Sequence, residues 1–183
     1  MLKECMKKSA QYISLIPALA WMGLIFYMSA QPAEVSGDLS GSISHMVVQF
    51  VNSIFFCDWS EAKILLLAEQ WDYPIRKLAH MTEFGILALL YLRALYMRML
   101  YSQKRNASEN NSELNNLYLV AFGATVLYAA TDELHQIFVP GRAGLITDIL
   151  IDSLGALLAL LAWSVLARVP GVVKNAGVDS TKA

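Results

Sequence analysis

Charge is scarce in this sequence. Only 16% of the 183 residues are Asp, Glu, Lys or Arg, whereas a soluble domain has roughly 25%. Hydrophobic residues make up 56%, so the composition excludes an ordinary soluble domain and predicts an integral membrane protein. The formal net charge is −1, and without a basic excess we expect no nucleic-acid partner.

Cysteine is equally scarce, and no change of composition marks a domain boundary. Cys5 precedes the first apolar run and Cys57 follows it, so a membrane would separate the two thiols and they cannot pair. We therefore expect neither a disulfide nor a cysteine metal site. The chain is interpreted as one domain over residues 1–183.

Four mainly apolar runs are long enough to cross a bilayer, which takes about 20 residues. They predict spans over residues 12–30, 78–97, 117–139 and 145–166. The alternative for the first run is a cleaved signal peptide that ends near Ala30. A span is favoured, because the run exceeds the usual length of a signal-peptide core and Met28 is bulky where cleavage needs a small residue.

The segment over residues 31–77 is too long for a simple turn. Apolar residues recur at helical spacing from Leu39 to Phe55, which predicts an amphipathic helix that lies on the membrane surface or caps the bundle. A second short helix is expected over residues 60–70, and Pro74 is well placed to open the next helix. The predicted fold is an all-α membrane bundle of four helices with an amphipathic helical outer loop.

Lysine and arginine are distributed unevenly about these spans. Ten of the 14 lie in or beside the two termini and the polar loop over residues 98–116, and four lie near the outer loop and the turn at Arg142. By the positive-inside rule, both termini and the polar loop should be cytoplasmic, and the outer loop should face outward.

Ionisable side chains inside the apolar runs form the candidate site, because charged groups at membrane depth are costly and usually functional. Asp132 lies ten residues before Arg142 and Asp152 ten residues after it. A connection of five residues, 140–144, would make the two helices antiparallel neighbours, so these carboxylates should meet at one depth. By the same count, His135 should approach Asp148.

A third helix should bring polar groups to the same layer. His80 and Glu83 share one helix face at i and i+3, and the cations Arg76, Lys77 and Arg142 should surround the opening. The inner halves of the helices lack charge, so we expect a pocket open to the outside rather than a channel. The candidate catalytic residues are His80, Glu83, Asp132, Glu133, His135, Asp148 and Asp152, and the candidate binding residues are Arg76, Lys77, Gln136 and Arg142.

Several spaced motifs combine into a recognisable signature. They are Lys77-x-x-His80-x-x-Glu83-Phe84, Asp132-Glu133-x-His135-Gln136-x-Phe138-x-Pro140-x-Arg142, Asp148 with Asp152, and Ser29-Ala30-Gln31-Pro32. Together they resemble the VanZ-like membrane proteins, although serine is more frequent at Ala30 and asparagine is equally familiar at Asp152. The resemblance implies a bacterial cytoplasmic-membrane protein linked to reduced susceptibility to teicoplanin-type glycopeptides. It implies no particular reaction.

Three interpretations of the candidate site remain open. In a catalytic one, His135 or His80 is the general base, and a carboxylate such as Asp132 or Glu83 orients it. A metal variant has little support because no H-E-x-x-H spacing is present, and no cofactor can be assigned. In a binding one, the cations hold a phosphate or carboxylate of a membrane lipid, a lipid-linked envelope component or a glycopeptide. In a structural one, the same groups form an internal network that fixes helix packing.

Overall fold

The computed structural model describes residues 12–101 and 111–168, and this part of the chain contains helices and no strand. The helices are α2 (Ile16–Ser29), α3 (Ala33–Phe55), α4 (Glu61–Tyr101), α5 (Asn111–Gln136) and α6 (Ile146–Leu166). The all-α prediction is confirmed for these residues. Cys5 and residues 102–110 of the predicted cytoplasmic loop lie outside the described ranges.

Three of the described helices are long and apolar enough to cross a membrane. The candidate spans are Glu61–Leu100, Leu114–Gln136 and Ile146–Leu166. The helix α2 is apolar but has only 14 residues, a length of about 21 Å at 1.5 Å per residue. A turn at residues 14–15 and Pro17 in the first helical turn start α2 later than the predicted residue 12.

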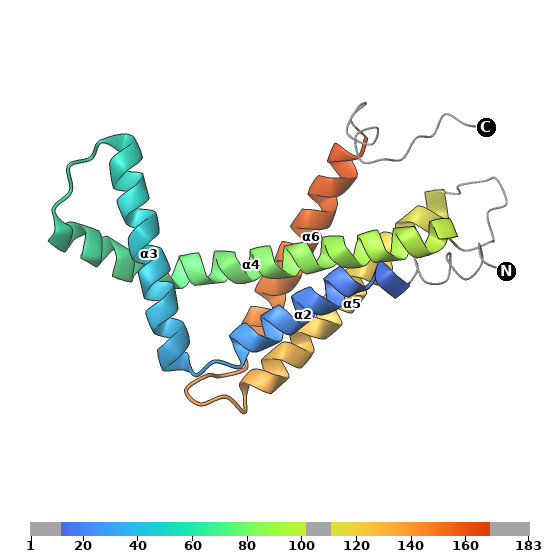
Figure 1. Ribbon diagram of the computed structural model, residues 1–183, viewed down its shortest axis with the longest axis horizontal. Coiled ribbons are helices and arrows are strands. Elements are labelled where there is room, and N and C mark those ends of the chain that lie inside the picture. Colours follow the sequence, from blue (N-terminus) through green and yellow to red (C-terminus); the bar gives the residue numbers. More distant parts are fainter. Residues whose placement is uncertain (1–11, 102–110, 169–183) are drawn as a thin grey trace.

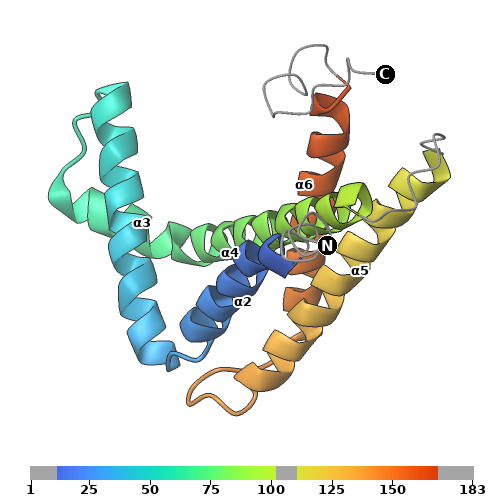
Figure 2. The same cartoon turned by 45° about the vertical axis from the view of Figure 1, so that its right-hand side comes forward.

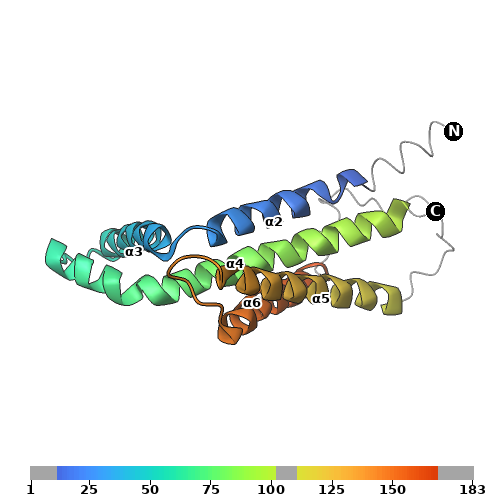
Figure 3. The same ribbon diagram turned by 90° about the horizontal axis from the view of Figure 1, so that it is seen from below.

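The prediction that Pro74 opens a new helix is wrong. α4 runs without a break from Glu61 to Tyr101 with Pro74 inside it, so the expected helices over residues 60–70 and 78–97 are one element. Proline removes a single backbone hydrogen bond, and helices at membrane depth tolerate that loss. Figure 3 shows α4 curving in its N-terminal third, as expected for a proline inside a helix.

The helices α2, α4, α5 and α6 have their ends at two opposite ends of the molecule, and their chain directions alternate. The start of α2, the end of α4, the start of α5 and the end of α6 lie toward one end of the molecule, at the right and top of Figure 1. The link between α2 and α3 and the connection between α5 and α6 lie together at the opposite end, as Figure 2 also shows. The structure thus has two distinct ends, and the four helix ends named first lie together at one of them.

The connection between α5 and α6 is longer than the five residues predicted. It spans residues 137–145, because α5 ends at Gln136 and α6 begins at Ile146. The loop packs on the start of α3: the Ala33 N–H donates to the Pro140 carbonyl at 3.1 Å. Gly141 has a φ of 74°, a conformation that favours glycine, and a Cβ there would lie 3.0 Å from the Ala33 Cβ.

Small residues bring α4 and α6 into close contact. A Cβ atom on Gly155 would lie 2.1 Å from the Met81 carbonyl oxygen, and one on Gly85 would lie 3.2 Å from the Gly155 carbonyl oxygen. A core cluster formed by α4, α5 and α6 includes the fully buried Ala121 and Ala156. Close packing of small residues is the usual way for membrane helices to associate.

The crossing yields a test of stability. Gly155→Ala should destabilise the protein by about 1–3 kcal/mol, the usual cost of overpacking, because the new methyl group meets backbone that cannot move aside. Gly123→Ala on α5 is the matched control, since nothing lies within 4 Å of its added Cβ. Thermal unfolding of both variants in detergent measures the difference. Equal melting temperatures would contradict the close crossing.

Candidate functional site

A cleft of about 320 Å³ lies where α2, α3 and α4 meet the loop over residues 137–145 and the start of α6. Seven of the candidate residues line it: Arg76, Lys77, His80, Glu83, Gln136, Arg142 and Asp148. The other four, Asp132, Glu133, His135 and Asp152, are absent from its lining. The structure therefore divides the predicted layer into residues that face the cleft and residues that lie behind it.

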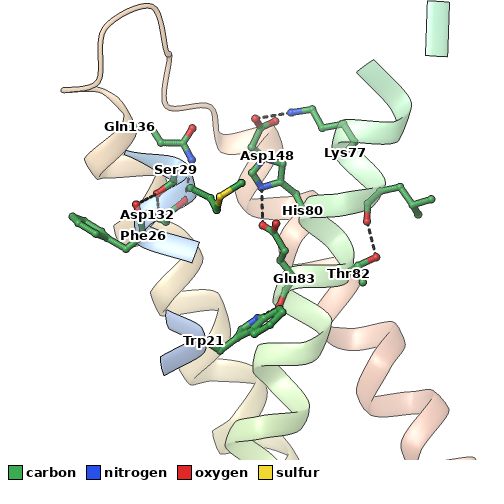
Figure 4. Close-up of polar contacts among 12 residues, drawn as sticks. Trp21, Phe26, Ser29, Lys77, His80, Thr82, Glu83, Asp132, Gln136 and Asp148 are labelled. Atoms are coloured by element: carbon green, nitrogen blue, oxygen red, sulfur yellow. Dashed lines mark hydrogen bonds and ion pairs between the residues drawn. The ribbon is translucent and has the colours of Figure 1, made fainter. Parts of the chain in front are cut away.

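Asp132 is buried behind the cleft with both carboxylate oxygens occupied. It is 4% exposed. Figure 4 shows Ser29 and Gln136 pointing toward it: the Ser29 hydroxyl donates to Oδ1 at 2.6 Å, and the Gln136 amide donates to Oδ2 at 2.9 Å. The Ser29 bond joins α2 to α5, whereas the Gln136 bond lies within α5. No hydrogen bond or ion pair joins Asp132 to Asp152 among the described residues.

Arg142 ties the same region together from the loop. Its Nε donates to the Gln31 carbonyl at 2.9 Å, and its Nη2 donates to the Met28 carbonyl at 3.3 Å, so the guanidinium satisfies carbonyls at the C-terminal end of α2. Its Nη1 lies 3.4 Å from Gln136 Oε1. Burial lowers the pKa of Arg142 below its ordinary value, and the nearby Asp132 carboxylate offsets part of this effect. The group stays cationic.

Glu133 and Asp152 are two further buried carboxylates. Glu133 Oε2 accepts a hydrogen bond from the Leu145 N–H at 2.8 Å, which supplies a side-chain acceptor at the start of α6, where Leu145 itself offers none. Asp152 is 2% exposed, and its side chain makes no hydrogen bond or ion pair with another described residue. No described cation therefore depends on its charge, at a position where asparagine is equally familiar in the family that the sequence resembles.

Four of the ionisable groups that line the cleft form two pairs (Figure 4). Lys77 Nζ lies 2.6 Å from Asp148 Oδ2 and 5.2 Å from the centre of the Tyr73 ring. His80 Nδ1 lies 3.9 Å from Glu83 Oε2, and the two side chains are 27% and 31% exposed. The second pair is accessible and is too long for a hydrogen bond, so both groups retain free capacity.

Arg76 lines the cleft next to Lys77. Its Nη2 donates to Asp72 Oδ2 at 2.7 Å and to the Ser40 hydroxyl at 2.9 Å, so α3 and α4 hold the guanidinium between them. Its Nε is buried and has no hydrogen-bond partner. The side chain therefore carries an unused donor beside the cleft.

His135 lies apart from the cleft. The expected approach of His135 to Asp148 is absent, since Asp148 pairs with Lys77 instead. The imidazole stacks on Phe26 of α2 with ring centres 4.5 Å apart, and its Nε2 is buried without a hydrogen-bond partner. His135 and His80 thus occupy different surroundings, and in the described residues no three His, Cys, Asp or Glu side chains converge in a way that could hold a metal ion.

Three side chains that contribute to the cleft are not among the predicted site residues. Ser29 lines the cleft. Trp21, whose indole donates to the Glu83 carbonyl at 2.9 Å, and Asp72, the partner of Arg76, each contact a residue that lines it. Ser29 stands in a quoted motif, and Asp72 precedes Arg76 by four residues on one helix, the spacing of an ion pair. Trp21 carried no signal in the sequence.

The sequence matches a known protein family. The sequence model of VanZ/LLP1 matches residues 14–167. The chain belongs to the VanZ/LLP1 family. The match covers the five helices of the described residues, so the VanZ/LLP1 domain contains the whole cleft and the residues behind it. No curated protein and no solved structure matches the chain.

The buried hydrogen bond of Ser29 can be tested in this VanZ/LLP1 protein. Ser29→Ala should destabilise it by about 1–3 kcal/mol, because one oxygen of a buried carboxylate loses its donor. Ser164→Ala is the control, since that exposed hydroxyl bonds only to the Leu161 carbonyl of its own helix. Thermal unfolding in detergent should separate the two variants. A Ser29→Ala protein as stable as the control would show that the link between α2 and α5 contributes nothing.

Proposed function

We propose that this VanZ/LLP1 protein acts at the outer leaflet of the bacterial cytoplasmic membrane, where the cleft holds an anionic envelope lipid or lipid-linked envelope component. His80 is the acid–base group, and Glu83 stabilises its charged form. The observation that carries the proposal is the accessible His80–Glu83 pair in a cleft that also contains Lys77 and Arg76. The teicoplanin link implied by the resemblance is the expected phenotype.

The candidate acid–base groups reduce to one pair, because Asp148 already pairs with Lys77 and the remaining candidates lie outside the lining of the cleft. Asp132 accepts from Ser29 and Gln136, so it has little capacity left to orient a histidine. His80 and Glu83 remain partly exposed to the cleft, and distances of this kind shorten when a ligand binds. A carboxylate beside an imidazole favours the protonated ring after it accepts a proton from the ligand.

Two cations are available for an anionic headgroup. Lys77 has three N–H donors and shares the cleft with Asp148, its one ion-pair partner among the described residues. Arg76 also lines the cleft, and its side chain is partly exposed. A phosphate or carboxylate held by both groups would replace water with charge-assisted hydrogen bonds, which are about twice as strong as neutral ones.

The outward orientation of the cleft rests on charge. The cleft lies at the end formed by the 137–145 loop, opposite the end that the lysine and arginine distribution predicts to be cytoplasmic. With that predicted orientation, the bound headgroup lies at the outer surface, on the side of the membrane where a glycopeptide arrives.

Loss of the acid–base pair should remove activity and spare the fold. His80→Gln and Glu83→Gln should each lower the reaction rate by about 100-fold or more, the usual contribution of general acid–base catalysis, and abolish teicoplanin tolerance at normal protein abundance. His45→Gln is the control, because His45 on α3 pairs with the exposed Glu61 outside this cleft. Susceptibility testing and membrane immunoblots provide the two measurements. Full tolerance in His80→Gln would reject the catalytic role.

A second candidate is a binder without chemistry, favoured by the adjacent cations Arg76 and Lys77 in the lining of the cleft. In that case Arg76→Lys and Lys77→Met should lose both tolerance and binding of phosphatidylglycerol added to the protein in detergent, whereas His80→Gln keeps both. Lysine cannot reproduce the forked contact of a guanidinium. Lys63→Met, a change of an exposed cation over Trp59, is the control. Unchanged lipid affinity in both cleft variants would reject the binding site itself.

A further inference from the structure

The helix α3 presents three different faces. The face toward α4 includes the buried Val48, which packs with Ile64 and Ala68, and the buried Ser44, whose hydroxyl donates to Asp72. A second face is polar and exposed. The third is an apolar stripe that no described element covers, and its residues are Val35, Leu39, Ile43, Met46, Val47, Phe50 and Ile54, each between 40% and 65% exposed. The stripe runs about 28 Å along the helix at 1.5 Å per residue.

Such a stripe is unfavourable in water, since contiguous apolar surface of this length marks a contact with a membrane or another molecule. The polar face on the same helix includes the exposed Asp38, Ser42 and Gln49. A helix with one apolar and one polar exposed side is suited to the membrane interface, with its apolar side among the acyl chains.

The orientation of α3 agrees with this location. Figures 1 and 3 show α3 running across the N-terminal part of α4 at a steep angle. When α4 crosses the bilayer, α3 therefore lies nearer to the plane of the membrane than to its normal. It does so at the end of the molecule that holds the cleft.

The stripe is continuous with the wall of the cleft. Leu39 and Ile43 belong to the stripe and also line the cleft, together with the half-buried Met28 of α2. We call these three residues the apolar lip. The cleft thus has cations and the His80–Glu83 pair in its interior and an uninterrupted hydrocarbon path from its edge onto α3.

We infer that the cleft takes its ligand sideways from the outer leaflet, and that the ligand is a membrane amphiphile whose acyl chain lies across the apolar lip and along the stripe of α3. The inference rests on the proposed function, in which the headgroup occupies the cleft. It adds that a free, water-soluble headgroup is a poor ligand. The charged interior and the lip match the two halves of one lipid, because anionic groups need the cations and the chain needs surface shielded from water.

Photo-crosslinking tests the path of the acyl chain. The probe is phosphatidylglycerol with a diazirine in one acyl chain, mixed into vesicles that contain the full-length protein. Labelled peptides should include Leu39 and Ile43, and excess unlabelled phosphatidylglycerol should compete. Ile43→Asp should reduce labelling at Leu39 by about tenfold or more, because a carboxylate is costly at membrane depth. Ser42→Asp, one residue away on the polar face, should leave that labelling unchanged.

The outcomes separate this inference from the proposed function. If the lip is unlabelled, or if Ile43→Asp and Ser42→Asp label alike, the acyl-chain path is overturned, and phosphatidylglycerol binding that still depends on Lys77 would leave the proposed function in place. Competable labelling of the lip that persists in Lys77→Met upholds the path and overturns the headgroup contact. Labelling that is competable in the wild type and lost in Lys77→Met upholds both.

Discussion

The carboxylate of Asp132 organises the end of the molecule that contains the cleft. A buried carboxylate is stable only when its oxygens are compensated, and here the donors are Ser29 from α2 and Gln136 from α5. The Gln136 amide oxygen in turn accepts from Arg142. The other guanidinium nitrogens of Arg142 donate to the backbone carbonyls of Met28 and Gln31. One buried charge thus fixes three segments of the chain against one another.

The short α2 depends on this arrangement. Its 14 residues are fewer than a full span requires, and Arg142 donates hydrogen bonds to the Met28 and Gln31 carbonyls at its C-terminal end. Nearer the start of α2, the Trp21 indole donates to the backbone carbonyl of Glu83. This bond holds α2 on α4 at one of the two residues of the His80–Glu83 pair. Hydrogen bonds to α4, to α5 and to Arg142 of the loop therefore position α2, which forms one wall of the cleft.

The structural interpretation of the ionisable residues explains only some of them. Asp132, Glu133 and Arg142 are consumed by hydrogen bonds that join helices and loops. His80 and Glu83 are not, because they are partly exposed and no hydrogen bond joins their side chains. Polar contacts between membrane helices contribute on average under about 1 kcal/mol, so a separate reason is needed for charges that face an open cleft.

Sequence alone determined the features that depend on local pattern. Hydrophobic runs of sufficient length predicted the spans near α5 and α6 within a few residues, and the motif spacing predicted the VanZ/LLP1 family. Helical spacing also predicted α3 as amphipathic. The proline rule misled at Pro74, because a helix with room on its proline side continues through the residue and only bends.

Tertiary structure decided which polar residues meet. Counting along the chain gave equal depth for Asp132 and Asp152, yet depth leaves the rotation of each helix and the length of the connection undetermined, and the connection is longer than predicted. The partner of Asp132 is Ser29, 103 positions away in sequence, and His135 turned to Phe26 rather than to Asp148. Such choices follow from how whole helices pack, since a side chain bonds to the nearest suitable group in space, and spacing along one helix carries no information about its neighbour.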